Sequence, residues 1–350
     1  MKIAIHPQQN SFSSRWIQYC EEKGIPYKIV DCYKSDIIEQ INDCDALMWH
    51  FHHANPKDYL FAKQLLYSVQ TSGKKVFPDF NTVWHFDDKV GQKYLFESIK
   101  APLVPCYVFY SPKDALNWAH NTSFPKVMKL RSGAGSVNVK LIKNRYKAIR
   151  LIRKAFGSGF KHDSLLNLKE LYRIFKLGKG SIFSIYKGVA RLFVSTQYAK
   201  VHQKERGYIY FQDFVSGNDS DTRIIVIGER AYAIKRLVRE NDFRASGSGI
   251  ILYSRYEIDM RCVKIAFELA KKLKSQCIAY DFIFDENNEP FIVEISFGFG
   301  VEAYDPCPGY WDSELNFHEG KFNPQFWMIE DLIQSISKNS VLLSSASTSV

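Results

Sequence analysis

Residues Cys277–Phe297, CIAYDFIFDENNEPFIVEISF, carry the clearest structural signal in the chain. Two apolar runs, 277–284 and 290–297, flank a polar turn rich in acidic residues and asparagine, which predicts a β-hairpin. Each predicted strand holds one carboxylate among apolar neighbours, Asp281 on the first and Glu294 on the second. Burying a lone carboxylate costs several kcal/mol unless it is paired or bound to a cation, so both acids need a partner.

A divalent cation is one candidate for that partner. Ser296 lies two residues beyond Glu294 and therefore on the same face of the strand. Together with Asp281 on the neighbouring strand, these side chains offer an all-oxygen pocket of the kind that Mg²⁺ prefers. The alternative is a sheet edge whose acids point to solvent, and the hairpin by itself leaves both interpretations open.

Composition sets the broad class. The chain has 350 residues with 46% hydrophobic and 15% aromatic content, enough for a large core divided into two or three domains. Its seven cysteines are scattered without a CxxC pair, which indicates reduced thiols in a cytoplasmic protein. The apolar stretch at the N-terminus is too short for a signal peptide, and no run of 18 apolar residues predicts a membrane span.

The N-terminal region alternates predicted strands with predicted helices. The strands are expected over residues 2–6, 27–32, 45–51 and 74–77, and the helices over residues 13–24 and 58–72. Alternation at this spacing favours a parallel α/β domain of the Rossmann type. No GxGxxG follows the first strand, so a dinucleotide cofactor is not expected.

A small-residue loop follows the predicted strand 126–130. Lys129 lies near the end of that strand, and the loop consists of Ser132, Gly133, Ala134, Gly135 and Ser136. Small residues allow backbone N–H groups to approach an anion closely, and the lysine adds a point charge. An ordinary glycine-containing hairpin turn is the alternative.

Arginines gather near a second Gly/Ser loop, at positions 236, 239 and 244. One such arginine is usually part of a surface ion pair. Three of them beside two strand carboxylates favour a clamp on phosphoryl charge.

The positive charge of the chain is concentrated in one segment. Residues 145–206 contain fifteen Lys and Arg against three acidic residues, so they account for more than the whole net charge of +10. Residues 148–156 place Ile149, Ile152 and Phe156 on one face of a predicted helix, and residues 181–194 form a second amphipathic candidate. Such helices suit an anionic membrane surface or an anionic polymer, or else they pack on their own domain with a solvated basic face. Aromatic residues lack a stacking-module pattern, so nucleic acid is not the expected partner.

Taken in order, these motifs resemble the ATP-grasp superfamily, and most closely the RimK/glutathione-synthetase-like carboxylate–amine ligases. The resemblance covers roughly 200 residues. The matching segments are Asp88-Lys89, Pro125–Lys129, Ser132–Gly135, Gln212–Val215, Asp221–Arg223, Lys235-Arg236, Asp242–Arg244, Asp281 and Glu294–Ser296.

The resemblance implies a Rossmann-like domain followed by a two-subdomain ATP-grasp fold that combines α/β and α+β parts. The expected limits are 1–100 for the first domain, 101–206 for subdomain A with its basic insertion 145–206, and 207–334 for subdomain B. A disordered, serine-rich tail is expected over 335–350.

The resemblance also implies roles for individual residues. Lys89 and Lys129 would hold the phosphates or adenine of ATP, and Ser132–Ser136 would cap the triphosphate. Gln212, Asp213, Phe214 and Val215 would form the hinge strand that contacts adenine. Asp281, Glu294 and Ser296 would bind Mg²⁺, although the family usually has Asn where this chain has Ser296. Arg236 and Arg244 would steady the transferring phosphoryl group.

The implied chemistry joins a carboxylate to an amine through an acyl phosphate, with release of ADP and phosphate. The expected substrates are small molecules, with an anionic glycan or a lipid-linked precursor, and peripheral membrane contact through residues 145–206, as alternatives. An ATP-grasp kinase and a non-catalytic ATP-binding module remain open as other functions. A dimer is compatible with the sequence, which does not fix the oligomeric state.

Overall fold

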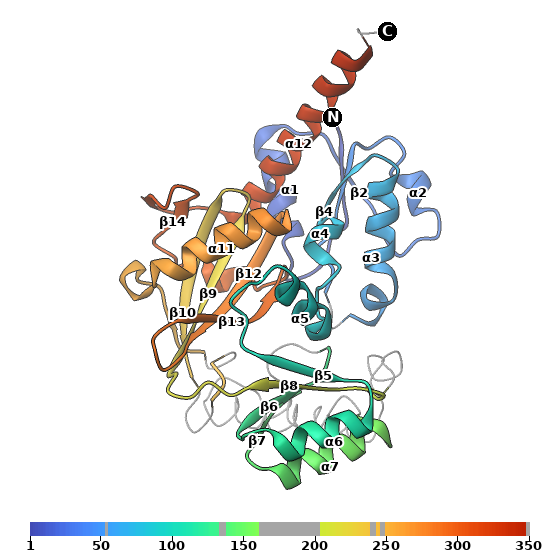
Figure 1. Ribbon diagram of the computed structural model, residues 1–350. Coiled ribbons are helices and arrows are strands. Elements are labelled where there is room, and N and C mark those ends of the chain that lie inside the picture. Colours follow the sequence, from blue (N-terminus) through green and yellow to red (C-terminus); the bar gives the residue numbers. More distant parts are fainter. Residues whose placement is uncertain (53–54, 133–137, 161–203, 239–242, 246–248, 348–350) are drawn as a thin grey trace, which may run out of the picture.

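The computed structural model describes residues 1–52, 55–132, 138–160, 204–238, 243–245 and 249–347. These residues form three sheets with helices packed on them (Figure 1). The predicted loop residues 133–136 and the predicted helix over 181–194 lie outside the described residues.

The N-terminal sheet has four parallel strands in the order β2-β1-β3-β4, which confirms the Rossmann-like prediction. The short runs IAI in β1 and ALM in β3 are fully buried, as expected for strands covered on both faces. The strands are β1 (Ile3–Ile5), β2 (Tyr27–Ile29), β3 (Ala46–Met48) and β4 (Lys75–Phe77), and the helices are α1 (Ser13–Lys23), α2 (Ile37–Gln40), α3 (Pro56–Thr71) and α4 (Phe80–Val83).

The second sheet is antiparallel and has the strand order β5-β8-β6-β7. Helices α6 and α7 cover one of its faces (Figure 1). The elements are β5 (Cys106–Phe109), α6 (Pro112–Asn121), β6 (Lys126–Lys129), β7 (Val139–Ile142), α7 (Arg145–Phe156) and β8 (Ile209–Asp213).

Helix α7 forms the start of the basic segment, and its apolar side packs on its own domain. Ala148, Leu151, Ile152 and Ala155 are buried in the core of the second sheet. The predicted face is therefore rotated by about one residue, because Ile149 is only partly buried. Since this apolar side is covered by the protein itself, α7 does not present it to a membrane.

The third sheet has seven strands in the order β13-β12-β9-β10-β14-β15, with β11 paired to β10. The predicted hairpin 277–297 is confirmed as β12 and β13, which pair antiparallel with Asp281 opposite Glu294. Helix α11 covers one face of the sheet (Figure 1). The elements are β9 (Ser220–Ile227), β10 (Arg230–Leu237), β11 (Ile251–Leu252), α11 (Met260–Leu273), β12 (Cys277–Phe284), β13 (Pro290–Ser296), β14 (Gly309–Asp312) and β15 (Phe317–Glu319).

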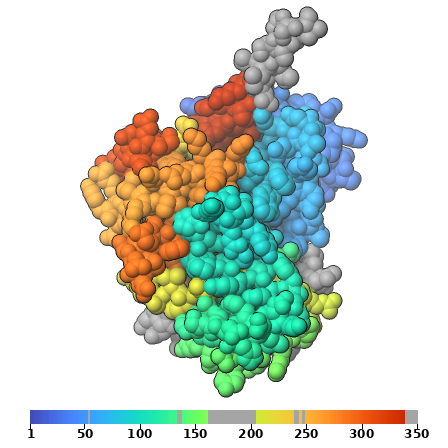
Figure 2. All heavy atoms as spheres, viewed as in Figure 1, coloured from blue at the N-terminus to red at the C-terminus, as the bar shows by residue number. Residues whose placement is uncertain are grey.

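Helix α5 (Lys89–Ser98) and the segment after it connect the N-terminal domain to the outer strand β13. The Gln92 side chain donates to the Ile295 carbonyl at 3.0 Å and accepts from the Ile295 amide at 3.3 Å. Farther along β13, the Ile292 amide donates to the Pro102 carbonyl at 2.7 Å, and the Ile292 carbonyl accepts from the Val104 amide at 3.0 Å. The space-filling view shows this part of the chain seated between the blue N-terminal domain and the orange third sheet (Figure 2).

The C-terminal segment differs from the prediction. Helix α12 runs from Pro324 to Ser347, so the disordered tail expected over 335–350 is wrong for residues 335–347. The prediction followed the serine-rich composition and overlooked apolar residues at helical spacing. Ile333 and Ile336 continue the apolar side of the helix from Ile329 and Leu332, and all four pack in or against the core. In the described part of the chain, no helix is long and apolar enough to cross a membrane.

Candidate functional site

A cavity of about 150 Å³ lies between the second and third sheets. Nine of the predicted site residues line it: Lys89, Lys129, Gln212, Asp213, Phe214, Val215, Arg244, Asp281 and Glu294. They come from α5, from β6 and β8 of one sheet, from β12 and β13 of the other, and from the segment after β10. The fold therefore brings together side chains that are up to 205 positions apart in the sequence.

Two buried lysines line this cavity, and one of them is paired with a carboxylate. Lys89 and Lys129 are each 5% exposed, and Lys89 Nζ lies 3.0 Å from Glu294 Oε1. Asp88 fixes the start of α5 by accepting hydrogen bonds from the amides of Val90 and Gly91. Lys129 Nζ donates to the Val293 carbonyl at 3.4 Å.

The two lysines have opposite pKa shifts. Burial by itself would lower the pKa of Lys89, but the adjacent Glu294 carboxylate, together with Asp87, holds the pKa above its ordinary value. Burial lowers the pKa of Lys129, which has no such direct ion pair with Glu294. Only Lys89 forms an ion pair with Glu294, so the ammonium group of Lys129 leaves this end of the cavity suited to further anionic charge.

The hinge segment Gln212–Val215 lies at the end of β8. The Gln212 side chain is buried and donates to Cys106 Sγ at 3.3 Å, while Lys126 Nζ lies 2.6 Å from Asp213 Oδ1. The Phe214 ring packs edge-to-face on Phe243 with 5.7 Å between centroids. The hinge therefore combines polar side chains held by neighbouring residues with an aromatic surface, which suits a flat heterocycle.

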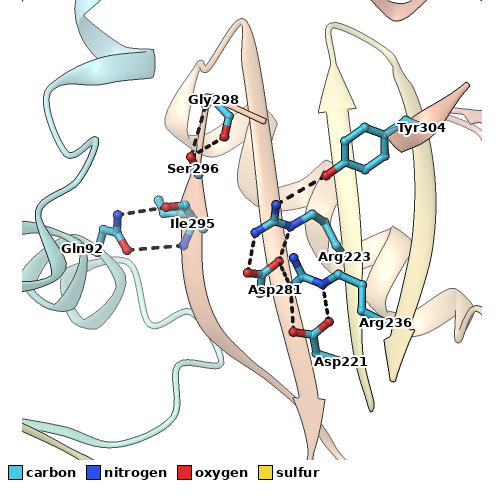
Figure 3. A network of polar contacts seen from close by, with 9 residues as sticks. All are labelled: Gln92, Asp221, Arg223, Arg236, Asp281, Ile295, Ser296, Gly298 and Tyr304. Atoms are coloured by element: carbon cyan, nitrogen blue, oxygen red, sulfur yellow. Dashed lines mark hydrogen bonds and ion pairs between the residues drawn. The ribbon is translucent and has the colours of Figure 1, made fainter. Parts of the chain in front are cut away.

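A row of charges crosses the face of the third sheet that borders the cavity (Figure 3). Asp281 on β12 lies opposite Glu294 on β13 and opposite Arg223 on β9, and Asp221 lies opposite Arg236 on the neighbouring strands. Residues that face each other across a strand pair share one face, so these five side chains point to the same side of the sheet.

Asp281 is bound by two arginines (Figure 3). Arg223 contacts both of its oxygens, with Nε at 2.5 Å and Nη2 at 2.7 Å, and Arg236 Nη2 lies 3.1 Å from Oδ1. Arg236 also binds Asp221 through two contacts of 2.6 Å. Burial would raise the pKa of Asp281, but the two guanidinium groups hold it well below its usual range.

The two arginines predicted to act on a phosphoryl group occupy different positions. Arg244 lines the cavity directly. Arg236 is buried and reaches the cavity wall through Asp221 and Asp281, which do line it. Asp221–Arg223 was among the segments that resemble the family, but no site role was predicted for Asp221 or Arg223. Their spacing of two, which places both side chains on one face of a strand, was the available signal.

Ser296 is not brought to the cavity. Its hydroxyl donates to the Gly298 carbonyl at 2.8 Å and accepts from the Gly298 amide at 3.2 Å, so it closes the turn after β13 (Figure 3). Across the described residues, no group of three or more His, Cys, Asp and Glu side chains is arranged to hold a metal ion. The candidate metal ligands are therefore Asp281 and Glu294.

Ser132 starts the predicted phosphate loop and is 2% exposed. Its hydroxyl donates to Glu205 Oε1 at 2.9 Å, a contact between residues 73 positions apart. Ser132 lines a second cavity, of about 200 Å³, between the N-terminal domain and the end of β6, together with Arg131, Asp88 and Lys63.

Comparison with known proteins agrees with this geometry. Residues 187–307 match the model of the RimK-like ATP-grasp domain. No curated protein matches the chain.

Solved structures align with nearly the whole chain. An ATP-grasp RimK domain protein from Sphaerobacter thermophilus has a TM-score of 0.55 and 12% identity, over 95% of this chain and 100% of that one. The D-alanine–D-alanine ligase from Bacillus anthracis has a TM-score of 0.55 and 16% identity, over 97% and 99%. A D-cycloserine synthetase has a TM-score of 0.57 and 14% identity, over 95% and 99%. At these identities the likeness establishes the fold.

Proposed function

The chain has the ATP-grasp fold, with a match to the RimK-like ATP-grasp domain over residues 187–307, and we propose that it is an ATP-dependent carboxylate–amine ligase. The observation that carries this proposal is the cavity between the two antiparallel sheets. One wall supplies the hinge and Lys129, and the other supplies Asp281 and Glu294. ATP bound there would have its adenine at the hinge and its phosphates near the lysines.

The carboxylates of the third sheet fit a magnesium ion that arrives with nucleotide. Mg²⁺ in such sites usually takes one or two protein carboxylates and completes its shell with phosphate oxygens and water. Asp281 and Glu294 stand opposite each other on β12 and β13 and both line the cavity. When bound, the ion would neutralise charge on the phosphate oxygens.

The arrangement suits a reaction in two steps. A substrate carboxylate oxygen attacks the γ-phosphorus of ATP, forming an acyl phosphate and releasing ADP. An amine nitrogen then attacks the acyl carbon, phosphate leaves, and the nitrogen loses a proton to give an amide. The attacking carboxylate and the phosphoryl group are both anionic, so Arg244 in the cavity and Arg236 behind Asp281 would lower their repulsion.

A non-catalytic ATP-binding module is a second candidate, favoured by one specific observation. Asp281 already has both oxygens bound by Arg223, and Ser296 is committed to its own turn. If the arginines keep Asp281, nucleotide would bind through the lysines and the hinge without turnover.

Phosphorus-31 NMR with Mg²⁺-ATP and a panel of small carboxylates and amines tests the two candidates. The ligase releases ADP and inorganic phosphate only when both substrates are present, and hydroxylamine replaces the amine to give a hydroxamate. Asp281→Asn should abolish both products. Nucleotide binding without turnover for the whole panel and for fractionated lysate would favour the non-catalytic module, and a new phosphoester signal would exclude both candidates.

A further inference from the structure

Two side chains from the segment before β8 hold the point where β6 leads toward the predicted phosphate loop. The Tyr208 hydroxyl accepts from the Arg131 amide at 2.6 Å and donates to Glu205 Oε2 at 2.8 Å. The other oxygen of the same carboxylate, Oε1, accepts from the Ser132 hydroxyl at 2.9 Å. Glu205 and Tyr208 thus bind two consecutive residues that are more than 70 positions earlier in the chain.

The backbone of Arg131 connects this contact to the candidate ATP site. Its amide is bound by Tyr208, and its carbonyl accepts from the Lys89 amide at 3.0 Å. Lys89 begins α5 and pairs with Glu294. Lys129 is the last residue of β6 and lies two residues before Arg131. A shift of the backbone at Arg131 would therefore be passed to the start of α5, where Lys89 lies, and to the end of β6, where Lys129 lies.

The backbone of Glu205 is also held in place, by a residue that follows α7. Glu205 forms a backbone bridge with Phe160, through amide-to-carbonyl distances of 2.8 and 2.9 Å in the two directions. Burial and the neighbouring Glu205 carboxylate raise the pKa of Tyr208 well above its usual value, so the phenol stays neutral and keeps its proton for Glu205. The Tyr208 hydroxyl can therefore donate to Glu205 at neutral pH.

The adenine side of the cavity has separate supports. Gln212 is held by Cys106 Sγ and Asp213 by Lys126, and neither of these contacts involves Glu205 or Tyr208. Loss of the Glu205–Tyr208 contact should consequently disturb the lysine end of the cavity and spare the hinge.

We propose that Glu205 and Tyr208 are positioning residues for the triphosphate of ATP, acting through the backbone of Arg131 and through Ser132 on Lys89 and Lys129. This inference rests on the proposed function only in that ATP occupies the cavity, because it concerns binding and requires no turnover. It assigns a role in the selectivity for ATP over adenosine to two residues before β8 that do not line the cavity.

The test measures dissociation constants for Mg²⁺-ATP and for adenosine with the full chain by calorimetry or competitive displacement. Tyr208→Phe removes the hydroxyl and should weaken ATP binding about threefold to tenfold, which corresponds to the usual net contribution of one hydrogen bond. Adenosine affinity should stay unchanged. Glu205→Gln retains an acceptor oxygen and should give a smaller loss of the same selectivity.

Tyr27→Phe is the matched control. Tyr27 donates to Glu21 at 3.0 Å on the surface of the N-terminal domain, so this variant also loses a tyrosine–glutamate hydrogen bond, but far from the cavity in sequence and outside its lining. It should bind both ligands like the wild type. Circular dichroism checks that each variant is folded, and Glu205→Gln carries the test if Tyr208→Phe does not fold.

Each outcome decides the inference. A selective loss of ATP affinity in Tyr208→Phe and Glu205→Gln supports positioning. Equal weakening of ATP and adenosine overturns it, since the residues would then support the cavity as a whole, and unchanged affinity for both ligands overturns it as well. A wild-type chain that binds adenosine and ATP equally would overturn the inference, and one that binds neither would overturn the proposed function along with it.

Discussion

Among single residues, the central finding is that one carboxylate has two kinds of candidate partner, a magnesium ion and a pair of arginines. Asp281 faces the cavity as a candidate magnesium ligand, yet Arg223 and Arg236 bind it from the neighbouring strands. The sequence predicted that Asp281 would need a partner, and the structure shows that guanidinium groups supply it. The register of three strands decides this, and a single hairpin motif does not contain that information.

The Asp281–arginine contacts should make stability depend on pH. Because the pKa of Asp281 is lowered in the folded state, its stabilising contribution is fully present above the unfolded pKa of about 4. This contribution is lost progressively as pH falls from there through the lower pKa of the folded state. Asp281→Asn should destabilise the chain at pH 7 by on the order of 3 kcal/mol, as for other broken buried ion pairs. Denaturant unfolding at pH 7 and pH 3 measures both.

The difference between wild type and Asp281→Asn should shrink at pH 3. A difference of the same size at both pH values would contradict the assignment of this stabilisation to the ionised carboxylate.

Ser296 provides a second prediction. Its hydroxyl closes a turn with Gly298, so Ser296→Ala should cost about 1 kcal/mol of stability and leave the Mg²⁺ concentration needed for ATP binding unchanged. Glu294→Gln should raise that concentration, since it removes a carboxylate that lines the cavity. A Mg²⁺ titration of ATP binding compares the variants, and a large increase for Ser296→Ala would show that the serine is a ligand after all.

At the scale of elements, helix α12 holds the N-terminal domain against the third sheet. Its buried residues join a core cluster that includes β1, α1, β9, β10 and β12. Trp327 stacks on Phe322 with 4.8 Å between centroids and lies under the guanidinium group of Arg230 at 5.0 Å. This helix is therefore a structural connection between two sheets, and its serine content says little about its role.

Trp327→Ala should lower the free energy of unfolding by about 3–5 kcal/mol, the range for removing a buried aromatic side chain. Tyr256→Ala is the control, because Tyr256 is 85% exposed and should cost little. Thermal unfolding followed by circular dichroism compares the two, and equal shifts in Tm would contradict the proposed docking of α12.

At the scale of the whole molecule, the strands and their types were largely predictable, whereas the contacts that complete the site were not. The alternation of strands with helices identified the parallel N-terminal sheet, and two apolar runs around a polar turn identified the hairpin of β12 and β13, because burial pattern and turn residues are local properties. The Ser132–Glu205 contact spans 73 positions and depends on how the second sheet closes. The contact of Arg223 with Asp281 depends on the register of β9 against β12, which no local sequence pattern encodes.

Ligand binding between two sheets should stabilise the molecule as a unit. Mg²⁺-ATP at 100 times its dissociation constant should add about 2.7 kcal/mol to the free energy of unfolding. Adenosine at the same multiple should add a similar amount, but Mg²⁺-ATP should do so at a much lower concentration because the lysine end of the cavity contributes only for the triphosphate. Thermal shift against ligand concentration measures this, and equal half-effect concentrations would contradict it.

The contacts along β13 have a consequence for association between chains. An outer strand normally exposes a row of unused backbone groups that another strand can adopt, which is a common start of aggregation. Here the side-chain amide of Gln92 and the backbone at Pro102 and Val104 occupy the outward groups of Ile292 and Ile295. Helix α5, which brings Lys89 to the cavity, and the segment after it therefore also cover the outer edge of β13, so that a strand of another molecule cannot pair there.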